Sequence, residues 1–155
     1  MKTNAARILD HAGISYGIRT YDFDESDLSA RTAAEKLGLP VESVFKTLVA
    51  QNDRKEIVLA CIPADTELDL KALGSVSGGK KADLVPIPDL QKLTGYLRGG
   101  CSPLGTKKPY RLFIDEMCEC HETISISAGL QGVQITIAPA DLIAVSDATI
   151  AQITR

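Results

Sequence analysis

The sequence predicts a mixed α/β (α+β) fold in a single compact domain that spans residues 1–155. A length of 155 residues is typical of one domain and is enough to bury a substantial core. A hydrophobic content of 45% and a charged content of 24% are typical of a soluble globular protein. Strand-like and helix-like segments interleave without a regular βαβ rhythm, which favours a mixed domain over a doubly wound one.

The first half of the chain carries helix and hairpin signals. Thr3 and Ser29 are predicted helix caps, and Gly13 and Gly38 are predicted helix stops. Two apolar runs joined by residues 52–55 predict a β-hairpin. The expected elements are, in order, a helix over 3–11, a strand over 14–21, a helix over 29–37, a helical turn over 41–45, and strands over 46–51 and 56–62.

The second half contains a glycine-rich segment, TGYLRGGCSPLGTKK, over residues 94–108. Glycines at 129 and 132 predict a turn between the last two strands. The expected elements are a helix over 68–73, a strand over 84–87, a helix over 88–93, strands over 111–115, 123–128 and 133–138, and a helix over 139–145.

Charge and aromatic content bear on the partners of the protein. A net charge of −3 argues against a protein that coats nucleic acid, and 5% aromatic residues without Trp argue against a base-stacking platform. Residues 71–111 nevertheless carry eight lysines and arginines against two aspartates. A local positive surface on an acidic body suits a phosphate-bearing ligand, and the alternative is an ordinary solvated face.

The cysteines and the N-terminal segment bear on the compartment. Cys61, Cys101, Cys118 and Cys120 lack the paired spacing of a secreted disulfide scaffold, so reduced thiols are expected. The opening segment has no apolar signal region, and no apolar run has the length of a membrane helix. The sequence therefore predicts a cytoplasmic protein. The CECH motif at 118–121 has no second pair of ligands, which favours a turn over a zinc site.

The segment GSVSGGKK at 74–81 matches the spacing of a phosphate-binding loop, G-x-x-x-x-G-K. That motif needs Ser or Thr next, to hold Mg²⁺, and Lys81 stands there instead. A helix precedes the segment and a strand follows it, which reverses the required order. The sequence therefore argues against a nucleotide triphosphatase.

Two further positions are candidates for chemistry. Cys101, in Gly100-Cys101-Ser102, lacks an evident base, because only His11 and His121 exist; an apolar filler is the expected role, with a nucleophile left open because of nearby cations. Lys46 shares a strand face with an apolar residue, Leu48, at the start of a buried strand. Such a lysine is expected to be partly desolvated and functional, and the alternative is an edge lysine.

Several motifs together resemble the YbaK-type deacylases of the YbaK/EbsC and prolyl-tRNA synthetase editing-domain superfamily. The matching segments, in the family's order, are TYDFD at 20–24, AAEKLGL at 33–39, FKTLV at 45–49, LDLKALG at 68–74, the loop at 94–108, and GVQITIAPADL at 132–142. The resemblance covers almost the whole chain. It implies a compact mixed β-sheet, partly closed into a barrel and flanked by helices.

The resemblance also implies an activity. Family members remove wrongly attached amino acids from tRNA, chiefly cysteine from tRNA(Pro), with Cys-tRNA(Cys) as a further candidate substrate. The hydrophobic amino-acid pocket of a tRNA synthetase cannot strongly reject an amino acid close in size to the correct one. A second site that removes the wrong amino acid is therefore needed. The implied route lets the thiol of the substrate attack its own ester, without cofactor or metal. The implied partners are the acceptor end of aminoacyl-tRNA and, transiently, prolyl-tRNA synthetase.

The resemblance assigns roles to particular residues. Lys46 matches the essential lysine and is the expected catalytic residue. The expected substrate-binding residues are Tyr21, Thr47, Gly99, Gly100, Ser102 and Pro103. The cations expected to contact tRNA are Lys80, Lys81, Arg98, Lys107 and Lys108.

The sequence departs from the family pattern at four positions: Ser29, Leu130, Gln131 and Thr136. These positions usually carry an aromatic residue, two basic residues and an acidic residue. Two alternatives therefore remain open. One is a deacylase for another small amino acid, such as alanine, that uses an activated water, and the other is a non-catalytic regulator that binds an aminoacyl or nucleotide ligand.

Overall fold

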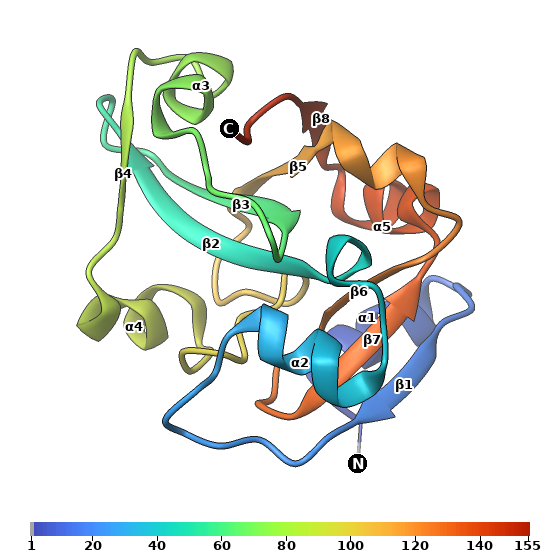
Figure 1. Ribbon diagram of the computed structural model, residues 1–155. Coiled ribbons are helices and arrows are strands. Elements are labelled where there is room, and N and C mark those ends of the chain that lie inside the picture. Colours follow the sequence, from blue (N-terminus) through green and yellow to red (C-terminus); the bar gives the residue numbers. More distant parts are fainter. Residues whose placement is uncertain (1) are drawn as a thin grey trace.

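The computed structural model describes residues 2–155 as two β-sheets with helices packed around them (Figure 1). The smaller sheet has the strand order β1 (Gly17–Thr20), β7 (Val133–Ile137), β6 (Ile124–Ser127). The larger has the order β4 (Ala82–Leu84), β2 (Phe45–Asn52), β3 (Ile57–Pro63), β5 (Arg111–Asp115), β8 (Thr149–Ala151). The helices are α1 (Asn4–His11), α2 (Ala30–Leu37), α3 (Leu70–Val76), α4 (Leu90–Thr94) and α5 (Pro139–Ser146).

The mixed α/β class is confirmed by the strand directions. Strand β2 runs antiparallel to β3 and β4, whereas β3 pairs with β5, and β5 with β8, in parallel. Within residues 2–155, one parallel bridge links the two sheets, between Val44 and Ser125. Among residues 2–155 the strands do not close into a barrel, so the partial closure implied by the family resemblance is not confirmed. No helix in this range is long and apolar enough to cross a membrane.

Both predicted N-caps of the first half are confirmed. The Thr3 side chain accepts a hydrogen bond from the Ala6 amide, and the Ser29 side chain accepts one from the Thr32 amide. Gly38 ends α2 in the left-handed conformation, with φ 68°. These local signals fixed the helix ends, because each cap satisfies backbone groups that the helix itself leaves unpaired.

Two strand predictions need correction, and two short elements were missed. The first strand begins at Gly17 rather than Ile14, because the Ile14 amide donates to Leu9 O and completes the end of α1. The strand predicted over 84–87 lies instead at Ala82–Leu84, since Pro86 opens a 3₁₀ turn over Ile87–Asp89. Strand β8 and a 3₁₀ helix over Glu116–Cys120 were not predicted, because both are short and lack an apolar period.

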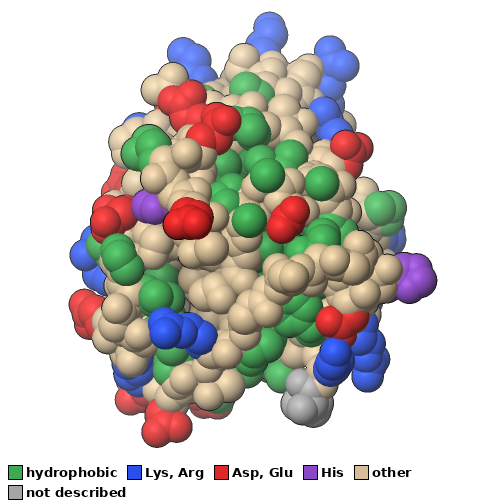
Figure 2. Space-filling view, turned by 90° about the vertical axis from the view of Figure 1, so that its right-hand side faces the viewer, with side chains coloured by type: hydrophobic (Ala, Val, Ile, Leu, Met, Phe, Trp, Pro, Cys, Tyr) green, Lys and Arg blue, Asp and Glu red, His purple; other side chains and the backbone are tan. Residues whose placement is uncertain are grey.

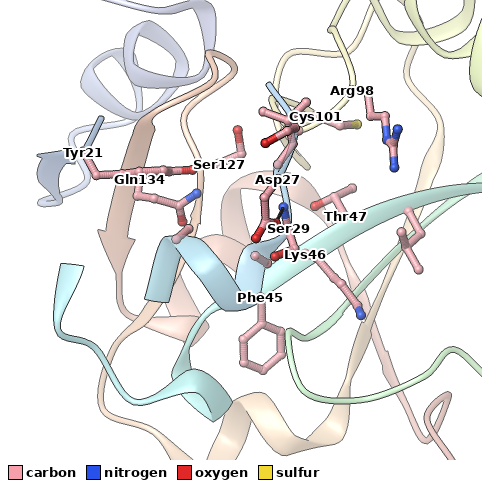
Figure 3. Close-up of a pocket in the computed structure, with 16 residues that line it drawn as sticks. Tyr21, Asp27, Ser29, Phe45, Lys46, Thr47, Arg98, Cys101, Ser127 and Gln134 are labelled. Carbon is pink, nitrogen blue, oxygen red and sulfur yellow. Dashed lines mark hydrogen bonds between the residues drawn. The ribbon is translucent and has the colours of Figure 1, made fainter. Parts of the chain in front are cut away.

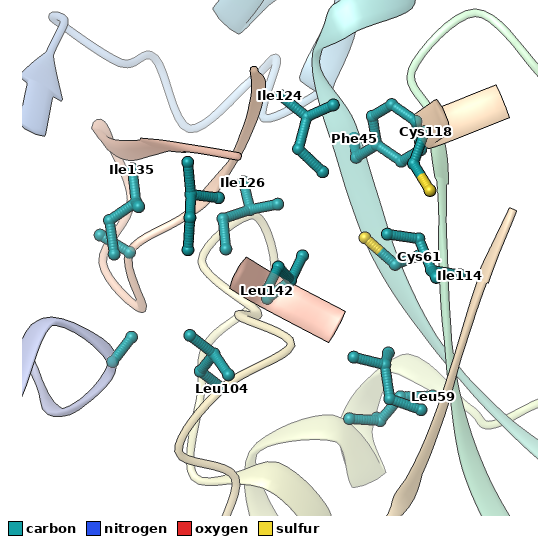
Figure 4. Close-up of a cluster of buried hydrophobic side chains, with 14 of the residues drawn as sticks. Phe45, Leu59, Cys61, Leu104, Ile114, Cys118, Ile124, Ile126, Ile135 and Leu142 are labelled. Carbon is teal, nitrogen blue, oxygen red and sulfur yellow. The ribbon is translucent and has the colours of Figure 1, made fainter. Parts of the chain in front are cut away.

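The hydrophobic core lies on both faces of the larger sheet. Figure 4 shows residues of the larger of its two main clusters. Alternation along β2 places Phe45 and Val49 in the larger cluster, and Leu48 packs against the smaller one. This is the alternation that the sequence predicted. The apolar side chains of β6 and β7 join the larger cluster: Ile124, Ile126, Ile135 and Ile137.

A buried carboxylate fastens the C-terminal segment to the larger sheet. Asp115, at the end of β5, is fully buried, and its Oδ1 accepts hydrogen bonds from the Ile153 amide and the Thr154 hydroxyl, each at 3.1 Å. Its Oδ2 accepts from the Met117 amide. A buried carboxylate is tolerated where such donors surround it, so Asp115 holds the chain that follows β8 in place.

Candidate functional site

A cavity of about 310 Å³ opens between the two sheets and the N-terminal end of α2 (Figure 3). Its walls come from segments far apart in the sequence: the loop before α2, the start of β2, the glycine-rich loop, and strands β6 and β7. Four residues assigned to the site from sequence line it, Tyr21, Lys46, Thr47 and Gly99, together with Arg98 and Cys101. The structure thus brings these residues to one place.

Lys46 is half-buried at the start of β2. Its Nζ donates to the Ala64 carbonyl at 3.3 Å, and burial lowers the pKa of the ammonium group, an effect that Asp65 opposes. Figure 3 shows the side chains of Lys46 and Thr47 on opposite sides of β2, as strand geometry requires. The partial desolvation expected from the sequence is therefore present.

Thr47 carries a buried hydroxyl that is only weakly paired. Within residues 2–155 its oxygen makes no hydrogen bond of normal geometry, and its partner is the thiol of Cys61, a weak hydrogen-bonding group opposite it in the register of β2 and β3. The Thr47 side chain also lines the cavity. A buried hydroxyl with so weak a partner costs free energy, so a ligand that offers a stronger donor or acceptor here gains a contact that the free protein lacks.

The glycine-rich loop forms a close-packed edge of the cavity. Gly99 has φ 81°, and a Cβ at this position would lie 2.8 Å from the Leu28 Cβ. A Cβ at Gly100 would lie 3.1 Å from the backbone nitrogen of Gln131, whose side-chain amide donates to Arg98 O at 2.7 Å. The loop is therefore held against the loop before α2 and against the β6–β7 turn.

The other loop residues assigned from sequence lie behind this edge. Gly100, Ser102 and Pro103 are not among the lining residues of the cavity. Ser102 is fully buried and its hydroxyl accepts from the Leu104 amide at 3.2 Å, while Pro103 lines a different hollow. These residues support the shape of the loop in this structure, and a direct contact with substrate remains a prediction for them.

Cys101 lines the cavity, but its setting does not activate the thiol. Burial raises the pKa of Cys101 to about 11, so the group is protonated at neutral pH. Neither His11 nor His121 lines the cavity. His121 packs edge-on against the ring of Phe45, with centroids 6.4 Å apart. The thiol therefore has neither a lowered pKa nor a histidine base within the cavity wall.

The cysteines of the CECH motif lie in different surroundings. Cys118 is buried in the larger hydrophobic cluster, whereas Cys120 is exposed. Within residues 2–155 no three histidine, cysteine or acidic side chains gather closely enough to hold a metal ion.

Sequence reasoning missed the polar wall formed by β6 and β7. Ser127 and Gln134 line the cavity and are nearly buried, and Gln134 Oε1 accepts a hydrogen bond from the Ser125 hydroxyl at 2.8 Å. The signal was present in the alternation of ISIS and VQITI, whose polar residues fall on the face opposite the core isoleucines. Asp27, in the loop before α2, was also not assigned to the cavity. Ser29 in the same loop was identified as a helix cap and as a departure from the family pattern, and it lines the cavity.

The five predicted tRNA-contacting cations do not line one surface. Arg98 lies at the cavity, Lys81 lines a second hollow beside β4, and Lys107 and Lys108 line a third beside the end of α5. The Lys80 amide is bound to the Asp53 carboxylate at 2.8 Å. Figure 2 shows lysine and arginine side chains at the edges of one face, interspersed with acidic ones. Contact with tRNA remains a prediction for all five.

The four residues that depart from the family pattern lie in different places in the structure. Ser29 lines the cavity, whereas Leu130 is an exposed residue of the β6–β7 turn. Gln131 bonds the glycine-rich loop, as described above. Thr136 faces the neighbouring strand, because a Cβ at Gly17 would lie 2.5 Å from its hydroxyl oxygen. Only Ser29 can therefore alter the lining of the cavity directly.

Comparison with known proteins places the chain in a family. Residues 25–145 match the model of the aminoacyl-tRNA editing domain, and the chain belongs to that family. One relative is EbsC of Enterococcus faecalis, named for a proposed Cys-tRNA(Pro)/Cys-tRNA(Cys) deacylase activity; it is 39% identical over 153 residues, which cover 99% of this chain and 93% of EbsC.

More distant similarities come from one sequence match and one solved structure. The multifunctional Ser/Thr-tRNA deacylase ProXp-y of Escherichia coli is 25% identical over 143 residues, covering 90% of this chain and 84% of that protein. The crystal structure of a proposed trans-editing enzyme for prolyl-tRNA synthetase superposes with a TM-score of 0.82 at 22% identity, covering 100% of this chain and 99% of that one. At this identity the superposition shows the fold.

Proposed function

We propose that this protein is a trans-editing deacylase that cleaves the ester of mischarged Cys-tRNA(Pro), with Cys-tRNA(Cys) as a second substrate. The observation that carries the proposal is that one cavity is lined both by the half-buried Lys46 and by the buried, weakly paired hydroxyl of Thr47, which come from opposite sides of β2. The 39% identity to EbsC over nearly the whole chain supports cysteine as the amino acid.

The proposed reaction uses the substrate's own thiol. Its sulfur forms a bond with the ester carbonyl carbon, the bond from that carbon to the ribose oxygen breaks, and the thiol proton passes to that oxygen, which becomes a ribose hydroxyl. The products are a cyclic thiolactone and uncharged tRNA. The protein has to orient the thiol and the ester, a contribution that proximity makes large without an enzyme base. The protonated Cys101 and the absence of histidine from the cavity wall are consistent with this route.

In this proposal Lys46 is the catalytic residue. Its ammonium group stabilises negative charge on the carbonyl oxygen as the sulfur attacks, because a preorganised charge in a partly dry site stabilises the transition state more than water does. Tyr21, Thr47 and Gly99 enclose the aminoacyl group, and Gly100 supports the loop behind Gly99. Arg98 at the cavity contacts the phosphate of the terminal nucleotide.

Recognition of tRNA(Pro) comes, in the same proposal, from a transient complex with prolyl-tRNA synthetase. The chain has a net charge of −3, and four of the five candidate tRNA-contacting cations are distributed over three hollows. Phosphate contacts of this kind position a nucleic acid without reading its sequence.

The test compares the deacylation of Cys-tRNA(Pro) and Ala-tRNA(Pro) by the wild type, Lys46→Ala and Cys101→Ala. We expect Lys46→Ala to lower the rate on Cys-tRNA(Pro) by roughly a hundredfold or more, as removal of one stabilising charge does elsewhere. Cys101→Ala should stay near the wild-type rate. Lys71→Ala, on the exposed face of α3, is the control for loss of a lysine.

Three results would contradict the proposal in different ways. Loss of activity in Cys101→Ala would restore the enzyme thiol as nucleophile. Equal rates on Ala-tRNA and Cys-tRNA would show that the substrate thiol is not required and would favour a deacylase that activates water. If the wild type cleaved neither ester, the protein would be a binding protein rather than a deacylase.

A second candidate is a deacylase for another small amino acid. The polar wall of Ser127 and Gln134 favours it, since these groups suit a hydroxyl-bearing side chain as well as a thiol. The relative ProXp-y is named for serine and threonine. Rates on Ser-tRNA and Thr-tRNA, measured beside the cysteine and alanine esters, separate the two candidates.

A further inference from the structure

Asp27 is an acidic residue in an otherwise neutral or cationic cavity. Of the described residues that line the cavity, it alone carries a carboxylate, whereas Lys46 and Arg98 carry positive charges. Figure 3 shows Asp27 and Ser29 in the chain segment between the β6–β7 wall, with Ser127 and Gln134, and Thr47 of β2. The site therefore presents charges of both signs to whatever enters it.

The Asp27 carboxylate is fixed in place but not saturated. Its Oδ1 accepts from the Ser29 amide at 3.2 Å and its Oδ2 from the Thr32 hydroxyl at 2.6 Å. A carboxylate has about four acceptor positions, so each oxygen can accept a further hydrogen bond. No lysine or arginine within residues 2–155 forms an ion pair with it. The Thr32 and Ser29 hydrogen bonds lower the pKa of Asp27, which keeps the group ionised at neutral pH.

An aminoacyl ester carries matching charges. Its α-amino group is cationic when protonated, and the phosphates of the tRNA end are anionic. Lys46 and Arg98 suit a carbonyl or phosphate oxygen and repel an ammonium group. The nearby Gln134 amide oxygen is neutral and already accepts from Ser125, so it offers a weaker contact.

We propose that Asp27 binds the α-ammonium group of the aminoacyl moiety and so selects esters whose amino group is free. This inference rests on the proposed function and deepens it. Esters whose amino group is acylated, such as peptidyl-tRNA, lack the charge and carry bulk at the same atom. The cavity then distinguishes a mischarged amino acid from a growing chain by its charge.

The test compares two esters of the same tRNA: the cysteinyl ester, and its α-hydroxy counterpart, which keeps the thiol but has no amino group. We expect the wild type to prefer the amino ester by roughly five- to tenfold in kcat/KM, the range of an exposed, charge-assisted contact. Asp27→Asn should lose this preference by slowing only the amino ester, because asparagine keeps an oxygen acceptor for the loop but not the charge.

The matched control is Asp24→Asn. The Asp24 carboxylate accepts from the Ser26 amide and the Ser26 hydroxyl in the same loop, but Asp24 does not line the cavity. It should retain the wild-type preference. Thermal unfolding of both variants checks that the loop is intact.

An equal loss of activity on both esters in Asp27→Asn, or no preference for the amino ester in the wild type, would overturn the inference.

A binding experiment separates the failure of this inference from the failure of the proposed function. It uses 3′-cysteinylamino-3′-deoxyadenosine, an amide that cannot be cleaved as an ester, and its α-hydroxy analogue. If the wild type cleaves neither ester, the proposed function fails. Weaker binding of the amino amide alone by Asp27→Asn then still supports the ammonium site, and equal binding of both analogues refutes it.

Discussion

At the scale of the residue, Thr47 carries a buried hydroxyl that costs stability. In the part of the chain that the structure describes, this hydroxyl makes no hydrogen bond of normal geometry and has only the Cys61 thiol as a weak partner, and its side chain lines the cavity. A well-packed protein satisfies almost all such groups, so each exception needs an explanation, and a ligand that completes the hydrogen bond is one. The same residue lies next to Lys46, whose ammonium is partly desolvated.

Replacement of Thr47 by valine removes the hydroxyl and keeps the shape of the side chain. We expect the free energy of unfolding to rise by about 1 kcal/mol, because a buried group with only a weak partner is eliminated. The deacylation rate should fall in the same variant. Urea denaturation and kcat/KM on Cys-tRNA(Pro) measure the two effects.

Thr66→Val is the control for this substitution. The Thr66 hydroxyl donates to Pro63 O at 2.7 Å, so its removal should lower stability. A drop in stability in Thr47→Val would show that the Thr47 hydroxyl has a stronger partner in solution.

At the scale of elements, α3 packs closely against the residue that precedes β4, and a glycine in α3 makes this close approach possible. A Cβ at Gly74, inside α3, would lie 2.3–2.4 Å from three backbone atoms of Lys81. Backbone atoms cannot move aside as the end of a flexible side chain can. Packing between α3 and the start of β4 therefore explains why Gly74 begins the segment GSVSGGKK. The phosphate-loop spacing of that segment is incidental.

Gly74→Ala sets two effects against each other. Alanine favours the helix by about 1 kcal/mol over glycine, whereas overpacking costs roughly 1–3 kcal/mol. Because backbone atoms form the obstacle, we expect the clash to dominate and stability to fall by at least about 1 kcal/mol. Ser75→Ala, exposed on the same helix, should be neutral or stabilising in the same denaturation assay. A stabilised Gly74→Ala would show that α3 can move away from β4.

At the scale of the whole molecule, buried thiols link stability to pH. Cys61 is fully buried, and its burial raises its pKa from 9.0 to about 12. Between these values the unfolded chain has lost the thiol proton and the folded chain retains it. The folded state therefore loses stability as the pH rises from about 9, by at most about 1.4 kcal/mol per pH unit from this group.

Cys61→Ala should remove this part of the pH dependence. The variant will be less stable at neutral pH because a core side chain is shortened, but its stability should fall less steeply between pH 8.5 and 10. Urea denaturation across this range measures the slopes. Cys120→Ala, at an exposed thiol, should keep the wild-type slope. Parallel slopes for Cys61→Ala and the wild type would contradict the assignment.

The sequence predictions were correct where the interacting residues lie close together in the sequence, and they failed where those residues lie far apart. The caps at Thr3 and Ser29 depend on residues three positions away, and both were predicted. The hairpin of β2 and β3 follows from two adjacent strand-like runs. Strand β8 forms because β5 offers a free parallel edge and Asp115 holds the segment that follows, and neither fact is visible in the local sequence.

The sequence by itself determined the mixed fold class, the family, and the position of Lys46 on a strand, because these depend on composition, local pattern and motif order. Only the tertiary structure decided which residues share the cavity. Asp27, Ser127 and Gln134 come from segments far from Lys46 along the chain and meet it through the packing of two sheets. The same packing placed Ser102 and Pro103 behind the loop edge, since burial depends on contacts between segments distant in sequence.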